Sequence, residues 1–108
     1  MKRGEIWTVS GGSGYTGKPR PAVILQDDHF SALASITICV FTSDETEAPL
    51  FRIAVEPSDE NGLKATSRMM ADKVSTVHKG RLGRKIGELS SKDMVRLERS
   101  LMVFLGIG

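Results

Sequence analysis

Short apolar runs separated by glycine, proline and charged residues make up most of the chain, and this pattern predicts strands. Strands are expected at residues 6–9, 22–25, 36–41 and 51–55, and further ones around 67–70, 73–77 and 85–89. The run at 22–25 is apolar at every position, which is typical of a central strand buried on both faces. Because proline donates no backbone hydrogen bond, pairing of that strand is expected to begin after Pro19 and Pro21.

The last eighteen or so residues follow a different period, which predicts a C-terminal helix. Ser90 can cap this helix, and Asp93 lies in its first turn, where the helix dipole favours a negative charge. Apolar positions then recur near helical spacing at Met94, Leu97, Leu101, Phe104 and Leu105. Several short strands and one terminal helix predict a mainly β fold, a small, strongly bent sheet or barrel closed at one end by the helix. With 108 residues, the chain fits a single domain over residues 1–108.

Composition narrows the class of protein without naming it. The formal net charge of +2 is too small to indicate nucleic-acid binding by itself. No apolar stretch is long enough to span a membrane and no signal-peptide core is evident, so a cytoplasmic protein is expected. The single cysteine, Cys39, lies in an apolar strand pattern and is expected to be an inert buried thiol. His29 and His78 have no metal-ligand spacing, so neither a metal ion nor another cofactor is expected.

Four polar residues stand where a strand meets a loop or among apolar neighbours. Arg20 lies between two prolines at the end of a glycine-rich loop, a stiff position suited to phosphate recognition. From the spacing alone, an ordinary solvated arginine is the alternative, because most arginines are exposed. Thr42 and Ser43 end a strand, where hydroxyls can bond an anion or simply form a turn. Asp72 lies among apolar residues in a basic setting. Such a carboxylate can act as a base, orient Arg20, or form a surface ion pair.

A second set of candidates could bind nucleic acid. Tyr15, in the glycine-rich loop, offers a ring on which a base can stack, whereas Trp7 is expected in the core. The cations that could border one groove in the folded chain are Lys18, Arg68, Lys79 and Arg81, together with Lys64, Arg84 and Lys85. The alternative is that these cations lie on a solvent-exposed face and bind no ligand.

The order of the motifs resembles that of the MazF/PemK/Kid family of toxins over essentially the whole chain. The matching segments are residues 3–7 (RGEIW), 17–26 (GKPRPAVILQ), 40–43 (VFTS), 70–77 (MADKVSTV) and 86–89 (IGEL), followed by the terminal helix. The resemblance implies an SH3-like barrel of the CcdB/PemK type and a homodimer. It also implies inhibition by an acidic cognate antitoxin, whose disordered tail occupies the RNA groove.

The activity that the resemblance implies is sequence-specific cleavage of single-stranded RNA, including mRNA, by attack of the ribose 2′-hydroxyl. Such a metal-independent endoribonuclease leaves 2′,3′-cyclic phosphate and 5′-hydroxyl ends. Arg20 and Thr42 match the family's catalytic arginine and its hydroxyl partner, and Asp72 matches an aspartate of the Kid-like branch. Ser43 would help Thr42 to hold a non-bridging oxygen. The group that takes the 2′-hydroxyl proton is Asp72 or Arg20 itself.

The sequence departs from the family pattern at two points, and two other functions are alternatives to the nuclease hypothesis. The loop offers residues 14–17 (GYTG) where many members carry an acidic residue before RPAV, and Met70 stands where the Kid-like branch has arginine. A CcdB-like toxin shares the barrel but poisons DNA gyrase without nuclease activity. A barrel that binds RNA without cutting it is the third possibility, because the fold alone does not define the activity.

Overall fold

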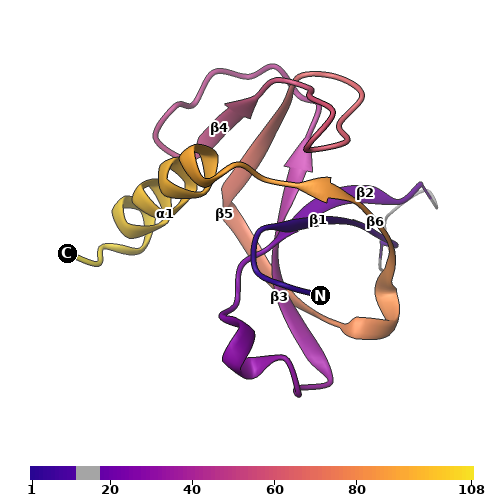
Figure 1. Cartoon of the computed structure of the whole chain (residues 1–108). Helices are drawn as coiled ribbons and strands as arrows, with labels where there is room; N and C mark the ends of the chain where they lie inside the picture. The colour runs from indigo at the N-terminus through magenta and orange to yellow at the C-terminus, as the bar shows by residue number, and fades with distance from the viewer. Residues whose placement is uncertain (12–17) are drawn as a thin grey trace.

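The computed structural model describes residues 1–11 and 18–108, and most of the regular elements in these residues are strands (Figure 1). The elements follow in the order β1 (Glu5–Val9), β2 (Arg20–Ile24), the short 3-10 turn η1 (Asp28–Phe30), β3 (Ser35–Thr42), β4 (Arg52–Val55), β5 (Ser67–His78), the 3-10 turn η2 (Lys79–Arg81), β6 (Leu82–Glu88) and the helix α1 (Ser91–Leu105). The mainly β fold with a C-terminal helix is therefore confirmed. Within the described residues, no helix has the length and apolar character needed to cross a membrane.

The six strands form one antiparallel sheet in the order β4-β5-β3-β2-β1-β6. The sheet bends strongly, and β6 runs back toward α1 (Figure 1). The loop before β5 rests on β6, because the Glu88 N–H donates to the Glu60 carbonyl at 2.8 Å. Gly62 has a φ of +68°, and a Cβ there would lie 2.0 Å from the Ile86 carbonyl oxygen. Only glycine allows this close contact, so the loop and β6 close one side of the barrel.

Strand β2 is buried on both faces, as its apolar run predicts. Val23 belongs to a core cluster that also contains Phe41 and Leu97 of α1. Ala22 and Ile24 belong to a second cluster on the other face. Neighbouring side chains of a strand point to opposite faces, so a strand between two cores must be apolar throughout.

Several strand boundaries and one pairing differ from the sequence prediction. Residues 67–78 form one strand rather than two, and a register shift between Cys39 and Phe41 on β3 lets the pairing continue past Asp72. Strand β6 begins at Leu82 rather than near Lys85. Pairing of β2 with β3 begins at Ala22, after the prolines, but pairing with β1 already includes Arg20 and Pro21. Proline lacks only the N–H group, so it can still take a register position in which no N–H is required.

Helix α1 begins and ends as its sequence predicts. The Ser90 hydroxyl accepts a hydrogen bond from the Asp93 N–H at 3.1 Å, and Gly106 ends the helix with a φ of +71°. Leu97 is fully buried, but the last turn extends beyond the core. Phe104 and Leu105 remain 49% and 61% exposed, so only the first part of the predicted apolar face packs on the sheet.

Candidate functional site

Arg20 and Thr42 come from neighbouring strands and meet at one end of the sheet. Ala22 pairs with Val40 and Val23 with Cys39, so this register, continued by two residues, places Arg20 opposite Thr42. Residues that face each other across an antiparallel pair lie on the same side of the sheet. The two residues line a cavity of about 170 Å³, here called the central cavity, whose other walls are Pro21, Phe41, Ser43 and Ser67. The structure thus brings together three predicted site residues: Arg20, Thr42 and Ser43.

The Thr42 hydroxyl is already oriented by the backbone. Its Oγ1 accepts a hydrogen bond from the Asp44 N–H at 3.1 Å. A hydroxyl has one proton to donate besides its acceptor capacity, so this bond fixes the oxygen and leaves the proton available for an anion. Ser43 is exposed beside it. The end of β3 therefore presents hydroxyl donors next to the Arg20 guanidinium.

Arg20 also lines a second cavity of about 320 Å³, here called the β5 cavity. Its walls are Val9, Ser10, Gly11, Arg20, Ile38, Val40, Ser75, Thr76, Val77 and Arg81. The Nε of Arg81 donates to the Ser10 carbonyl at 3.1 Å, which holds this guanidinium in the wall. A second predicted cation thus lies in a cavity that includes Arg20.

A third and larger cavity of about 930 Å³ adjoins the central cavity on its other side. This proline cavity is lined by Thr8, Pro19, Pro21, Gly62, Leu63, Lys64, Ala65, Ser67, Gly83, Arg84, Lys85 and Ile86. It shares Pro21 and Ser67 with the central cavity. Shared lining residues link the three cavities, here called the Arg20 groove. The groove walls contain five cations, of which Lys85 is paired with Glu5 and Glu88, and no carboxylate. Such a surface favours a polyanion.

Asp72 lies in a different environment. Its Oδ1 and Oδ2 accept hydrogen bonds from Arg52 Nε and Nη2 at 2.8 and 2.9 Å, and both side chains are mostly buried. These hydrogen bonds from the Arg52 guanidinium hold the pKa of Asp72 below its usual range. Asp72 lines neither of the two cavities that contain Arg20. The structure therefore pairs this predicted residue with Arg52 rather than bringing it to Arg20.

The remaining predicted binding residues are spread more widely. Arg68 donates to Glu47 at 3.0 Å and to the Asp44 carbonyl at 3.2 Å, and it lines none of the three cavities of the groove. Lys79 donates to the Ser31 carbonyl, outside the groove. Lys18 is exposed next to Pro19, and Tyr15 lies outside the described residues. Of the predicted cations, Arg81 is therefore the one that joins Arg20 in a cavity wall.

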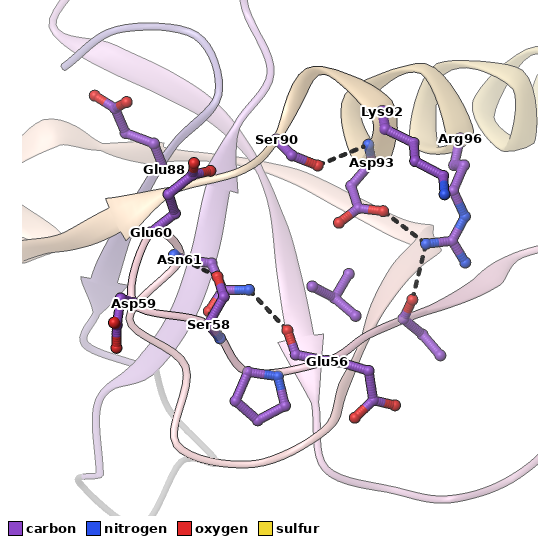
Figure 2. Close-up of a pocket in the computed structure, with 13 residues that line it drawn as sticks. Glu56, Ser58, Asp59, Glu60, Asn61, Glu88, Ser90, Lys92, Asp93 and Arg96 are labelled. Atoms are coloured by element: carbon purple, nitrogen blue, oxygen red, sulfur yellow. Dashed lines mark hydrogen bonds and ion pairs between the residues drawn. The ribbon is translucent and has the colours of Figure 1, made fainter.

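A cavity of about 690 Å³ between the 56–61 turn and the start of α1 has the opposite character (Figure 2). Its walls carry five carboxylates and two cations: Glu56, Asp59, Glu60, Glu88 and Asp93, with Lys92 and Arg96. Arg96 donates to the Asp93 carboxylate at 2.7 Å (Figure 2) and to the Ala54 carbonyl at 3.0 Å. This acidic cavity would repel a phosphate chain.

The remaining chemistry-bearing side chains have structural roles. Cys39 is fully buried, as predicted, and this burial raises the pKa of its thiol to about 12. His29 lies exposed in η1, and His78 accepts a hydrogen bond from the Gly80 N–H. Among the described residues, no three His, Cys, Asp or Glu side chains are grouped so that they could hold a metal ion.

The hydroxyl residues of the groove that sequence reasoning missed include Ser67 and Thr8. Ser67 separates the central and proline cavities, and Thr8 lies in the wall of the proline cavity. The signal for Ser67 is the pairing of Thr42 with Arg68 on β5, which places the neighbouring serine at the same end of the sheet. No local motif marks this position, because the two segments are 25 residues apart.

Comparison with known proteins identifies the class to which this barrel and groove belong. The family model described as PemK-like, MazF-like toxin of type II toxin-antitoxin systems matches residues 2–105. The chain belongs to this family of toxins.

Similar proteins agree with that assignment. The chain is 50% identical over 107 residues to a probable endoribonuclease MazF of Mycolicibacterium smegmatis, covering 99% of this chain and 98% of the relative. A solved mycobacterial endoribonuclease in complex with its cognate antitoxin is 25% identical, with a TM-score of 0.83 over 100% of this chain and 97% of that one. A MazE-MazF crystal structure from Deinococcus radiodurans, 18% identical with a TM-score of 0.82 over 100% of this chain and 98% of that chain, shares the fold.

Proposed function

We propose that this chain, an endoribonuclease toxin of the MazF-like family, cleaves single-stranded RNA at the Arg20–Thr42 pair without a metal ion. The 2′-hydroxyl of the nucleotide before the scissile phosphate loses its proton and attacks phosphorus, and the O2′–P bond forms. The P–O5′ bond breaks, and the leaving oxygen takes a proton. The products are a 2′,3′-cyclic phosphate and a 5′-hydroxyl. A single domain over residues 1–108 carries this activity.

The observation that carries the proposal is the shared cavity of Arg20 and Thr42. During attack, negative charge builds on the non-bridging oxygens of the phosphate, and the Arg20 guanidinium neutralises it. The Thr42 hydroxyl, fixed by the Asp44 N–H, donates to one of these oxygens, with Ser43 beside it. Donors placed in advance where charge develops supply much of the rate enhancement in such sites.

In this proposal Asp72 has a structural role rather than the role of a base. Both of its oxygens are bound by Arg52, and a carboxylate whose pKa is lowered is a weaker proton acceptor. Charge neutralisation by Arg20 is therefore the main catalytic effect in this proposal. Asp72 contributes by holding β4 against β5.

Two alternatives are less well supported. The relatives and the neighbour at 25% identity carry the name endoribonuclease, which favours a nuclease over a CcdB-like gyrase poison. An RNA-binding barrel without activity would not need hydroxyl donors and a guanidinium in one small cavity. The nuclease hypothesis explains both observations.

Incubation of the purified protein with a long single-stranded RNA in EDTA tests the proposal. We expect cleavage without added metal, with 2′,3′-cyclic phosphate and 5′-hydroxyl ends. A 2′-deoxyribose at the cleaved position should block the cut. Cleavage that stops in EDTA and returns with magnesium, or that leaves a 5′-phosphate, would refute the mechanism. A gyrase supercoiling assay on the same sample tests the CcdB-like alternative.

Assembly and control are part of the same proposal. Exposed apolar side chains gather at the end of α1, at Met102, Val103, Phe104, Leu105 and Ile107, and a two-fold homodimer would cover such a surface. The cationic groove also suits the acidic tail of a cognate antitoxin, which orders on binding and excludes RNA. The dimer and its antitoxin would both act in the cytoplasm, where mRNA is available. A monomer in light scattering at micromolar concentration would refute the dimer.

A further inference from the structure

The proline cavity adjoins the central cavity but has no part in the chemistry proposed above. Pro21 and Ser67 line both cavities, so a chain whose phosphate binds at Arg20 can extend past these two residues into the proline cavity. At about 930 Å³ the cavity has the size of a small-molecule site and exceeds what a phosphate alone needs. A nucleotide next to the scissile phosphate is the part of the substrate that can reach it.

The walls of the cavity suit the flat, apolar face of a nucleobase. Pro19 and Pro21 line one side, and Leu63 and Ile86 line it as well. Burial of a base against such side chains removes apolar surface from water. Burial of apolar surface therefore favours binding of a base in this cavity, next to the reacting phosphate.

The wall formed by the loop before β5 is fixed in advance. The Asn61 side chain, only 5% exposed, accepts hydrogen bonds from the N–H groups of Ser58 and Leu63 at 2.9 Å and donates to the Glu56 carbonyl at 2.8 Å. The close contact of Gly62 with Ile86 locks the same loop onto β6. A wall that is already ordered binds a ligand without a further cost in conformational entropy.

Among the polar side chains of the cavity wall, Thr8 and Lys85 can each donate to a ligand. Thr8 Oγ1 accepts from the Arg84 N–H at 3.0 Å and keeps its own proton for a ligand. A Cβ on residue 83 would lie 2.5 Å from this oxygen, so Gly83 leaves the hydroxyl uncovered. Lys85 Nζ is held in the wall by Glu5 and Glu88 at 3.2 and 2.9 Å. Hydroxyl and ammonium donors match the keto oxygens of guanine and uracil, whereas the amino groups of adenine and cytosine need acceptors.

We propose that the proline cavity is a nucleobase subsite, which binds the base of one nucleotide adjacent to the scissile phosphate and prefers guanine or uracil there. This inference rests on the proposed endoribonuclease activity, because that activity places the phosphate at Arg20. The subsite makes the cavity a determinant of the cleaved sequence.

The test combines a cavity-filling variant with substrates that lack one base. Ala65 is exposed at the cavity wall, so Ala65→Leu fills part of the cavity while leaving the backbone unchanged. Ala32→Leu is the matched control, because Ala32 is also exposed but lies beside η1, away from the groove. Short RNAs containing the cleaved sequence are made with an abasic ribose at each position flanking the cut in turn, and kcat/KM is measured for all three proteins.

One abasic position should lower kcat/KM of the wild-type protein by about tenfold, which is the usual scale for the loss of one buried base. Ala65→Leu should cut the intact RNA more slowly by a similar factor and show no further loss with that abasic RNA. Ala32→Leu should behave like the wild type. At the same position, adenine or cytosine should be cut several times more slowly than guanine or uracil. Equal melting temperatures of the three proteins exclude a folding defect.

Failure of the subsite and failure of the proposed function give different results. In one outcome the wild type leaves 2′,3′-cyclic phosphate ends, while the loss of kcat/KM at every abasic position is the same in the wild type and in Ala65→Leu. That result refutes the subsite and leaves the proposed nuclease activity intact. Independent, multiplicative losses in the variant and the abasic RNA lead to the same conclusion. If the wild type cuts no RNA, both inferences are refuted.

Discussion

Arg20 and Arg52 are each the first residue of a strand, yet their surroundings differ. Arg20 is exposed and lines two cavities whose walls contain no carboxylate. The Arg52 side chain is 16% exposed and forms a two-point ion pair with Asp72. A guanidinium neutralised by a carboxylate has little charge left for a phosphate, whereas it does help to hold two strands together. The comparison separates a binding arginine from a structural one.

Replacement of Arg20 should have the largest effect on activity. Arg20→Ala should lower kcat/KM by about a hundredfold to a thousandfold, as expected when a preorganised donor to the transition state is lost. The melting temperature should stay within about a degree, because exposed side chains contribute little to stability. Arg20→Lys should recover part of the activity, since lysine keeps the charge but not the planar fork. Cleavage of RNA by Arg20→Ala at the wild-type rate would remove the distinction between the two arginines.

Thr42 tests the hydroxyl next to Arg20. Thr42→Val should lower kcat/KM by about tenfold to a hundredfold, the usual scale for a hydrogen bond to a charged group. Thr42→Ser should stay within about threefold of the wild type, because it keeps the oxygen that accepts from the Asp44 N–H. If the valine and serine variants were equally slow, the methyl group rather than the hydroxyl would matter at this position.

The sequence predicted most of the fold because its strongest signals are local. The apolar run at 22–25 and the Ser90 cap of α1 are both set by neighbouring residues, and the structure has both. The single β5 strand was missed because residues 70–73, which interrupt its pairing with β3, look like a break in the local pattern, and only the partner strand shows that pairing resumes beyond them. The exposed last turn of α1 was missed for a similar reason. Helical spacing shows which residues share a face, but not where the sheet below them ends.

The candidate site was predictable only in part. Arg20, Thr42 and Ser43 were placed together by motif order, and the register of β2 and β3 explains why they meet. The pairing of Asp72 with Arg52 was not predictable, since Arg52 carries no motif and lies 20 residues away on the other side of a loop. Ser67 and Thr8 depend on strand order in the same way. Contacts between distant strands follow from topology, which a single sequence does not display.

Asp72 tests the structural side of the comparison. Asp72→Asn leaves the Arg52 charge without a carboxylate in a mostly buried position, and it should lower the free energy of unfolding by about 2 kcal/mol. Well below the melting temperature, kcat/KM should stay within about threefold of the wild type. A double-mutant cycle with Arg52→Gln, followed by urea unfolding, should give a favourable coupling free energy for this pair. Loss of all cleavage in a folded Asp72→Asn protein would instead make Asp72 the base.

Acid pH should affect the structural ion pairs in a graded way, and this is the smallest expected effect. Burial alone would raise the pKa of Glu5, but hydrogen bonds from the Lys2 N–H, the Trp7 indole and Lys85 lower it to about 2, from 4.5. The hydrogen bonds from Arg52 likewise lower the pKa of Asp72. A carboxyl whose pKa is lowered by folding stabilises the protein fully above pH 4.5, and this contribution is lost as pH falls through the lowered pKa.

The free energy of unfolding, measured with urea, should therefore fall below pH 4.5. Glu5→Gln and Asp72→Asn should each reduce the slope of this free energy against pH. Arg20→Ala, which removes no carboxyl group, is the control and should leave this slope unchanged. Parallel curves for all four proteins would show that neither carboxylate is held by its partners as the structure indicates.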